Sequence, residues 1–386
     1  MRAATVSFVD DDPTQIGRDI AAELCELLGR APELVLMFSA ARYDHARVLA
    51  GLYERLPTVR VVGCSSFGEI NSEEALSGSV TAMGIAAEGT PFATFVAPDI
   101  SGDTRGAGRA FAAEVQAFAP DLLIVFPDGL KVNSTQFLLG LQDVLGDRFP
   151  IIGGVAADEG AFERTCELFD REVHSGGAVG VAFKGVVQLV TAARSGWMPI
   201  GSLRTCTRVE GGNVLLEIDG QPALELYRTY LGPRAGEMPA VSAEFPIGVV
   251  GGVAGSQRLA DDEILLLRGI RRIDEPRRAL VFGGDLPEGA QVRMTRATKA
   301  DVIQGADEAG AKVCAALPRP TIAFFFDCMA RKIVLGPRYK DELRATFARL
   351  GPDVPKVGFY TFGELSPVEG TTMHHEETFT IALLQA

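Results

Sequence analysis

The sequence has few of the residues that mark metal-binding, secreted or nucleic-acid-binding proteins. Its six cysteines are scattered over 386 residues and form no C-x-x-C pair, which argues against a zinc knuckle and against a secreted disulfide framework. Thirty-seven Lys and Arg residues stand against 50 Asp and Glu residues, so the formal net charge is −13. Because phosphate groups bind clustered Lys and Arg, we expect neither a nucleic-acid nor a membrane partner.

Long apolar runs are also absent. A membrane-spanning helix needs about 20 consecutive apolar residues, and no stretch of the sequence approaches that length. Near the N-terminus, the three aspartates at 10–12 interrupt the chain before an apolar signal segment could form. We therefore expect a soluble, cytoplasmic protein.

What the sequence does contain is enough apolar material for a core and many turn residues. The apolar fraction is 47%, with 43 Gly and 21 Pro but only one Trp, and this balance favours many tight turns over a helical bundle. At about 150 residues per domain, the length predicts two domains, with three as the alternative.

A strand–helix–strand–loop–strand unit recurs three times. Each copy begins with an apolar run too short for a helix, continues with a helical pattern and a second strand, and ends in a further apolar strand. The expected first strands are residues 34–38, 122–126 and 322–326. The expected helices are 48–56, 134–145 and 337–350, the second capped by Asn133 or Ser134 and the third opened by Pro337. The expected last strands are 79–86, 177–184 and 378–384.

The loop after the second strand carries the closest internal match. Residues 62–69 and 357–364 share Gly63/Gly358 and Glu69/Glu364, and the middle copy has Glu159 at the same spacing from its glycine. The glycines fit a sharp turn or a close backbone approach. The glutamates leave two interpretations open: they face a ligand cleft at the strand ends, or they cap neighbouring backbone amides.

A different pattern separates the second and third copies. Strands at 204–210 and 213–218 flank Gly211-Gly212 and predict a hairpin. Pro222 opens a short helix that ends at Gly232, and strands are expected at 247–250, 264–267 and 279–282. Thr298 and Asp301 resemble a capping box that opens a helix toward Leu317.

Together these segments resemble the FIST sensory domains, an N-terminal and a C-terminal module that usually occur together. The resemblance rests on the segments 34–39, 62–70, 217–223, 245–248, 287–292, 327–331, 358–367 and 375–378. It places the N-terminal module at 20–217 and the C-terminal module at 218–386, with a soft boundary near 217. Because two modules use the whole chain, we expect no output domain.

The resemblance implies a function and a class of ligand. Such proteins are bacterial cytoplasmic sensors of small molecules, for which amino acids and related metabolites are proposed ligands. The chain is then expected to bind a ligand without catalysis and to act on a separate signalling protein, such as a histidine kinase or a cyclic-dinucleotide enzyme.

This sequence departs from the family pattern in two places. It has His375-Glu376-Glu377-Thr378 where the family commonly shows His-Asn-Gln-Thr, and Asp327-Cys328 where the family commonly shows Ser-Cys. Both changes add negative charge near the expected site, which favours a ligand with a cationic group over a bare phosphate.

The expected ligand site gathers residues from both modules. Glu69 and Glu364 would accept a ligand ammonium group, and Arg331 would donate to a carboxylate, unless it forms a structural ion pair with Asp327 or Glu364. The complete expected set is Gly63, Cys64, Glu69, Arg331, Gly358, Tyr360, Glu364 and His375.

Two alternatives remain open at this point. The first is a haem-based nitric oxide sensor with His375 as axial ligand, or His374 in its place, and with Phe325, Phe326, Phe359, Tyr360 and Phe362 lining the haem. Since no C-x-x-C-H motif is present, such a haem would be non-covalent. The second is a cysteine-dependent enzyme that uses Cys64 or Cys328, or an interaction scaffold without a ligand. The predicted fold in every case is α/β, with two modules of repeated units and mixed sheets.

Overall fold

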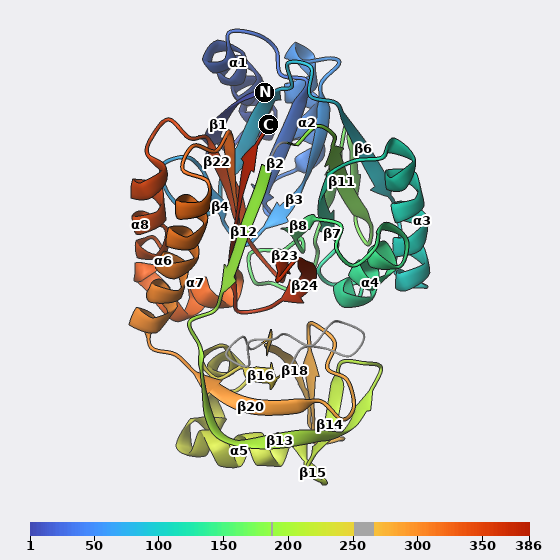
Figure 1. Cartoon of the computed structure of the whole chain (residues 1–386), viewed down its shortest axis with the longest axis vertical. Coiled ribbons are helices and arrows are strands. Elements are labelled where there is room, and N and C mark those ends of the chain that lie inside the picture. Colours follow the sequence, from blue (N-terminus) through green and yellow to red (C-terminus); the bar gives the residue numbers. More distant parts are fainter. Residues whose placement is uncertain (187, 251–265) are drawn as a thin grey trace.

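The computed structural model describes residues 1–186, 188–250 and 266–386, and it confirms the predicted mixed α/β fold. Figure 1 shows a larger body above and a smaller domain below. The smaller domain, built from the described part of residues 198–296, is inserted into the third unit of the body. Within the described residues, no helix is both long and apolar enough to cross a membrane.

The body consists of three units with one plan: a first strand and helix, a central strand and helix, a third strand, an exchanged strand and a last strand. Unit 1 contains β1 (Arg2–Phe8), α1 (Pro13–Leu28), β2 (Leu34–Ala40), α2 (His45–Arg55), β3 (Arg60–Ser66), β4 (Glu69–Ile70) and β5 (Val80–Ala86). Unit 2 contains β6 (Phe92–Ala97), α3 (Thr104–Phe118), β7 (Leu122–Pro127), α4 (Ser134–Leu145), β8 (Ile151–Gly154), β9 (Glu167–Phe169), β10 (Glu172–His174) and β11 (Ala178–Phe183).

Unit 3 follows the same plan, with the inserted domain between its first strand and its first helix. It contains β12 (Gln188–Arg194), α6 (Lys299–Ala316), β21 (Ile322–Cys328), α7 (Met329–Leu335), α8 (Asp341–Leu350), β22 (Lys356–Thr361), β23 (Glu364–Val368), β24 (Thr371–His375) and β25 (Phe379–Gln385). A 3₁₀ turn, Gly336–Arg338, lies between α7 and α8.

Polar caps fix where several of these helices begin. Asn133 accepts a hydrogen bond from Gln136 N at the start of α4, which confirms the predicted cap. Thr298 and Asp301 form the predicted capping box of α6. The predicted start of the third-copy helix at Pro337 is wrong, because Pro337 lies in the 3₁₀ turn and α8 begins at Asp341.

The strand registers repeat from unit to unit. The central strand pairs parallel to the third strand and antiparallel to the last strand, and the last strand pairs antiparallel to the first strand. The parallel pairs are β2–β3, β7–β8 and β21–β22. The predicted repeat is therefore confirmed, but the sequence analysis missed the first strand of every unit and the first helices of units 1 and 2; it predicted α6, the first helix of unit 3, without assigning it to the repeat.

A cyclic exchange of short strands joins the three units. β4 of unit 1 pairs with β22 of unit 3, β9 of unit 2 pairs with β3 of unit 1, and β23 of unit 3 pairs with β8 of unit 2. Every unit thus gives one strand and receives one. The body is therefore a closed ring of three units with approximate threefold symmetry.

The inward faces of the three central strands form the shared core. Phe38, Phe126 and Phe326 occupy equivalent positions, and their ring centroids lie 5.2 Å apart for the first pair and 6.1 Å for the second. All three side chains are buried. The same apolar residues that alternate along each strand thus fill the centre of the ring.

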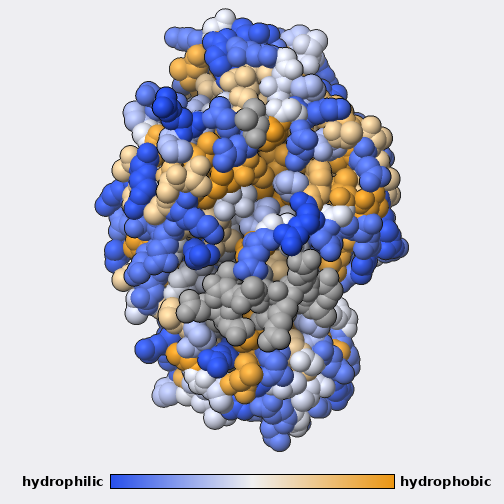
Figure 2. All heavy atoms as spheres, viewed as in Figure 1, coloured by the Kyte–Doolittle hydropathy of each residue, from blue (hydrophilic) through white to orange (hydrophobic). Residues whose placement is uncertain are grey.

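The first strands of the units are less well covered than the central ones. β1, β6 and β12 are mostly half-buried, whereas β2, β7 and β21 are buried throughout. Figure 2 shows apolar residues gathered on the upper body in this view, flanked by hydrophilic ones.

The inserted domain has its own antiparallel sheet and its own core. Its elements are β13 (Met198–Glu210), β14 (Val214–Ile218), β15 (Gln221–Pro222), α5 (Ala223–Leu231), β16 (Ile247–Val250), β17 (Leu266–Arg268), β18 (Ile270–Asp274), β19 (Ala279–Phe282) and β20 (Gln291–Arg296), with 3₁₀ turns at Gly232–Glu237 and Ala240–Glu244. The predicted hairpin at Gly211-Gly212, the helix after Pro222 and the strands at 247–250 and 279–282 are confirmed. Of the predicted strand 264–267, the first two residues lie outside the described residues.

The three-dimensional division of the chain differs from the expected module boundary. Residue 217 lies within β14, in the middle of the inserted domain, and unit 3 is completed by residues on both sides of that domain. The boundary near residue 217, between the N-terminal and the C-terminal sequence module, stays a prediction.

Candidate functional site

Three buried glutamates mark the three junctions at which strands are exchanged. Glu69 pairs with Phe359, Glu167 with Cys64, and Glu364 with Gly154, each one residue after the glycine of the receiving strand. The expected correspondence of Glu159 is wrong. Glu159 is exposed, and Glu167 takes the equivalent position because the loop between β8 and β9 is longer than its two counterparts.

Each of these carboxylates caps the amide that directly precedes the last strand of its own unit. Glu69 accepts from Ser79 N at 2.9 Å, Glu167 from Gly177 N at 3.1 Å, and Glu364 from Thr378 N at 3.3 Å. Burial raises the pKa of all three carboxyl groups. Of the two interpretations open from the sequence, this geometry matches capping of neighbouring amides.

A hydroxyl supports two of the three glutamates. Ser66 Oγ donates to Glu69, and Thr361 Oγ1 donates to Glu364 at 2.7 Å. The equivalent residue in unit 2 is Ala156, which has no hydroxyl. Oε1 of Glu167 accordingly finds no hydrogen-bond partner among the described residues.

The two expected glycines allow strands to approach closely. A Cβ atom at Gly63 would clash with the carbonyl oxygen of Met37, and one at Gly358 would clash with that of Phe325. Gly153 has the same relation to Val125 in unit 2. These glycines are thus required by the backbone geometry of every unit.

Arg331 and Tyr360 lie between the sheet and the helices of unit 3. The Arg331 guanidinium is 3.1 Å from Asp327 and also pairs with Glu342, and it donates to the carbonyl oxygen of Val302 at 2.9 Å. Arg331 is fully buried, so it forms the structural ion pair left open above, with Glu342 in place of Glu364 as second partner. The Tyr360 hydroxyl has no hydrogen-bond partner among the described residues.

The expected cysteine nucleophiles are poorly placed for catalysis. Cys64 lies on β3 and Cys328 at the end of β21, and both are buried. Burial raises the pKa of both thiols well above the usual value, which disfavours the reactive thiolate.

His375 lies within the pair of strands β23–β24. Its Nε2 atom is 3.1 Å from the carbonyl oxygen of Ser366, and burial lowers its pKa to about 4. An axial haem ligand needs a free ring nitrogen beside a large cavity. Nε2 is engaged and His375 lines neither of the two cavities described below, so this geometry gives no support for a haem at His375.

A second group of titratable side chains, all buried except the half-buried Arg271, lies where the inserted domain meets the body. We call this group the domain seam, and it consists of Arg268, Arg271, His374, Glu376 and Glu377. The two arginines belong to β17 and β18 of the inserted domain, and the other three residues belong to the β24 end and the following turn of unit 3. The sequence analysis identified His374, Glu376 and Glu377 but missed the two arginines. No motif or spacing in the sequence links the arginines to those residues.

Donors of the inserted domain form hydrogen bonds with acceptors of the body at the domain seam. Gly269 N donates to Glu376 at 2.8 Å, and Arg268 Nη1 donates to the carbonyl oxygen of His374 at 3.2 Å. Arg271 Nη1 donates to the carbonyl oxygen of Gly129 at 2.8 Å. The inserted domain is therefore tied to the body by polar contacts at this seam.

Several polar atoms of the seam nevertheless lack a partner. Arg268 Nη2, His374 Nε2 and Glu377 Oε2 are buried and find no hydrogen-bond partner among the described residues. Burial raises the pKa of Glu376 and Glu377 and, together with Arg268, lowers that of His374. A buried polar atom without a partner costs about 1–3 kcal/mol, so these atoms indicate a place where a further polar group would bind favourably.

Glu377 also has an unusual backbone conformation. Its φ angle is 55°, and the equivalent residues in units 1 and 2 are Gly78 and Gly176, with φ of 71° and 95°. The equivalence follows from the capped amides, because each of the three residues directly precedes one. Left-handed backbone favours glycine, which units 1 and 2 have at this position. Unit 3 has a glutamate instead, although the backbone geometry disfavours any side chain there.

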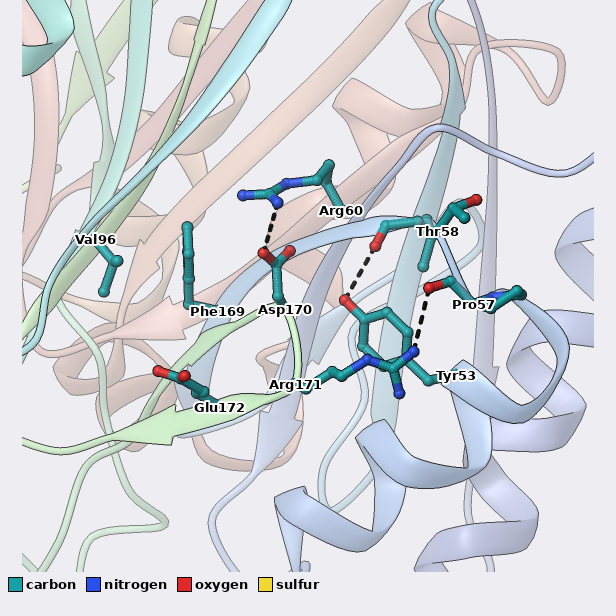
Figure 3. Close-up of a pocket in the computed structure, with 10 residues that line it drawn as sticks. Tyr53, Pro57, Thr58, Arg60, Val96, Phe169, Asp170, Arg171 and Glu172 are labelled. Carbon is teal, nitrogen blue, oxygen red and sulfur yellow. Dashed lines mark hydrogen bonds and ion pairs between the residues drawn. The ribbon is translucent and has the colours of Figure 1, made fainter.

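Two surface cavities lie away from both clusters. The first, of about 520 Å³, lies between α2, β3, β6 and the β9–β10 hairpin (Figure 3). Its guanidinium groups already have partners, because Arg60 pairs with Asp170 at 2.8 Å and Arg171 lies 4.0 Å from the centroid of the Tyr53 ring. The second, of about 420 Å³, follows β12 and the β23–β24 turn. Neither is lined by a residue of the expected site.

Comparison with known proteins gives relatives over nearly the whole chain. An uncharacterized protein of Mycobacterium tuberculosis is 28% identical over 370 residues, which cover 93% of this chain and 92% of the relative. An uncharacterized protein of Methanocaldococcus jannaschii is 25% identical over 230 residues, which cover 56% of this chain and 44% of the relative.

Solved structures give a weaker likeness. A cyanuric acid hydrolase matches with a TM-score of 0.31 and 11% identity, over 99% of each chain. A chorismatase matches with a TM-score of 0.34 and 10% identity, over 100% of this chain and 98% of that one. At these TM-scores the likeness carries no argument about fold or activity.

Models of protein families give the decisive match. The FIST N domain matches residues 33–221, and the FIST C domain matches residues 223–367. The two matches adjoin and follow the order that the sequence motifs predict. The chain therefore belongs to the FIST family, and it carries both the N and the C domain of that family.

Proposed function

We propose that this protein is a small-ligand sensor for signal transduction, that its ligand binds without catalysis at the domain seam, and that it acts on a separate partner protein. Membership of the FIST family supports a sensory role. The observation that carries the location is the set of buried, unpartnered polar atoms contributed by both domains at one seam.

The connection between the domains supports a switching role for this seam. Residues 195–197 and 297–298 are the two chain segments that link the inserted domain to the body. A ligand that bridges Arg268 and Glu377 would favour one arrangement of the two domains over another. Such a preference is what a sensor requires, because a ligand shifts an equilibrium only by its difference in affinity for two states.

The charges of the seam favour an amino acid or a related metabolite. Arg268 Nη2 can donate to a carboxylate, and Glu376 and Glu377 can accept from an ammonium group. Charges of both signs within one seam complement a zwitterion better than a simple anion or cation.

Isothermal titration calorimetry of the purified full chain against a panel of amino acids and related metabolites tests this proposal. We expect heat of binding for at least one amino acid, and at least about tenfold weaker binding by Glu377→Gln, since tenfold corresponds to about 1.4 kcal/mol. Glu308→Gln, an exposed change on α6, is the control and should bind as the unchanged protein does. Absence of heat across the panel, or equal binding by Glu377→Gln, would contradict the proposal.

The signalling step needs a partner such as a histidine kinase or a cyclic-dinucleotide enzyme. We expect the ligand to change the activity of a co-purified partner in the presence of this protein and to leave the partner unaffected without it. The same assay with Glu377→Gln should lose the ligand response while the protein still binds the partner. A ligand response that survives in Glu377→Gln would show that signalling does not depend on ligand binding at the domain seam.

A further inference from the structure

The two surface cavities of the body occupy equivalent places in the ring of units. Each lies between the start of the third strand of one unit and the first strand and exchanged hairpin of the next unit. The turns of the two hairpins correspond as well, because Asp170 in the first cavity and Glu369 in the second are both left-handed, with φ of 51° and 52°. The fold thus forms the same cavity twice, and a difference between the two linings is not required by the backbone.

The charges of the first cavity balance one another. Its charged lining residues are Arg60, Asp170, Arg171 and Glu172. Arg60 pairs with Asp170 at 2.8 Å, and Arg171 donates to the carbonyl oxygen of Pro57 at 3.1 Å. Figure 3 shows both contacts. With two cations and two carboxylates, this lining favours neither an anion nor a cation.

The second cavity has a surplus of positive charge. Its charged lining residues are Arg148, Arg194, Lys312 and Glu369. Even when Arg148 is set against Glu369, the two positive charges of Arg194 and Lys312 remain. The chain as a whole has a formal net charge of −13, so this surplus runs against its general composition. Cations gathered in one cavity attract an anion, and two of them complement a dianion.

Neither of these two cations has a carboxylate partner within the part of the chain that the structure describes. Arg194 is half-buried at the end of β12, and its Nη1 atom donates to the carbonyl oxygen of the neighbouring Ala193 at 2.9 Å. Lys312 is exposed on α6. A guanidinium has several N–H donors, so Arg194 can still donate to a carboxylate.

The rest of the lining supplies an apolar wall. Its apolar side chains include Pro150, Leu189, Pro367 and Val368. The consecutive residues 191–194 of β12 all line the cavity, so it runs along the free edge of this strand and not over one face. A short aliphatic chain can therefore lie against the apolar wall while charged groups at its two ends reach the cations.

We propose that the second cavity binds a small aliphatic dicarboxylate, at a site separate from the domain seam. One carboxylate pairs with Arg194 and the other with Lys312, and the methylene chain lies against Leu189 and Val368. The volume of about 420 Å³ lies within the usual range for small-molecule sites. Such a ligand connects α6 and β12 of unit 3 with the segment before β8 of unit 2, and so stabilises this junction.

Isothermal titration calorimetry of the full chain with glutarate tests the proposal. We expect saturable binding of glutarate, at least about tenfold tighter than that of pentanoate, which has the same chain length and a single carboxylate. Inorganic phosphate, which lacks the apolar chain, should also bind at least about tenfold more weakly than glutarate. The diamine 1,5-diaminopentane has the same chain length and the opposite charge, and it should give no heat of binding.

Variants locate the site. Arg194→Gln and Lys312→Gln should each weaken glutarate binding at least about tenfold, and the exposed position of Lys312 keeps the test valid if Arg194→Gln does not fold. Arg171→Gln removes a cation from the first cavity and is the matched control, which should bind glutarate as the unchanged protein does.

Several results would overturn the proposal. They are no heat with glutarate, equal binding of glutarate and pentanoate or phosphate, binding of the diamine, and full glutarate binding by Lys312→Gln. Glutarate binding that falls in Glu377→Gln and not in Lys312→Gln would place the ligand at the domain seam and would also overturn it.

Discussion

Units 1 and 2 of the body share their backbone plan with unit 3, but unit 3 carries far more buried charge. The central strand has Ser39 in unit 1 and Pro127 in unit 2, where unit 3 has Asp327, which pairs with Arg331. Positions that the shared backbone requires carry the same residue in all three units, as the glycines at the parallel strand pairs do. The residues in which unit 3 differs are therefore the better guide to function.

The turn before the last strand gives the sharpest form of this comparison. Units 1 and 2 have Gly78 and Gly176 in left-handed backbone, and unit 3 has Glu377. A non-glycine residue in this region costs about 1–3 kcal/mol. A residue that is unfavourable for the fold and lies in the domain seam indicates a role for its carboxylate.

The largest expected effect concerns the glycines common to all units. We expect Gly358→Ala to lower the free energy of unfolding by about 4 kcal/mol, because the new Cβ clashes with the Phe325 carbonyl oxygen in a buried strand pair. Gly102→Ala, which meets no atom within 4 Å, is the control. Urea denaturation measures the stability of both variants. Equal unfolding midpoints for the two variants would show that the fold does not require the close approach of the two strands at Gly358.

The next effect concerns a buried histidine of unit 3. His375 has a pKa of about 4 in the folded protein and about 6.5 when unfolded, so the unfolded state binds more protons between these values. Stability is lost as pH falls through this window, by about 3 kcal/mol for this group at pH 4. In His375→Gln, the loss of stability between pH 7 and pH 4 should be smaller by that amount.

The control for this measurement is His174→Gln, a change at a less buried histidine of unit 2. Urea denaturation at a series of pH values compares the two variants with the unchanged protein. A pH dependence that is identical in all three would mean that the pKa of His375 is not lowered in the folded protein.

A smaller effect, of opposite sign, is expected at the domain seam. Glu377→Gly should raise the free energy of unfolding by about 1–2 kcal/mol, because glycine relieves the left-handed backbone and removes a buried carboxylate oxygen that has no partner. Gly176→Ala should have the reverse effect in unit 2. A loss of stability in Glu377→Gly would show that the carboxylate stabilises the fold, and would break the proposed contrast between the units.

The smallest effect concerns the one junction glutamate without a hydroxyl partner. Ala156→Ser places a hydroxyl where Ser66 and Thr361 stand in the other units, and we expect about 1 kcal/mol of added stability from a hydrogen bond to Glu167. Ala107→Ser on α3 is a control without this acceptor. Thermal denaturation compares the melting temperatures of the two variants. An equal change in both would argue against the equivalence of the three junctions at which strands are exchanged.

Much of the fold follows from local patterns in the sequence. The buried strands at 34–38, 122–126 and 322–326 have short apolar runs, and Asn133 and Thr298 show their capping roles directly. The first strands of the units were missed because they are only half-buried and so lack a continuous apolar run.

The candidate site was less predictable than the fold. Glu167 escaped notice because a longer loop moves it away from the spacing that the other two glutamates share. Arg268 and Arg271 carry no motif, and they reach His374 and Glu376 only because a domain is inserted within unit 3. Spacing along the chain cannot reveal a contact that depends on how two domains meet.

The sequence by itself determined the family, the α/β class and the repeated unit, because strand and helix patterns and short motifs are local. The tertiary structure decided that the repeats close into a ring by exchanging strands and that Glu69 and Glu364 cap amides of their own chain. It also brought two arginines to Glu376 and Glu377 at the domain seam. Pairing between distant strands and burial of charge depend on the whole arrangement of the chain, and no local segment of the sequence encodes them.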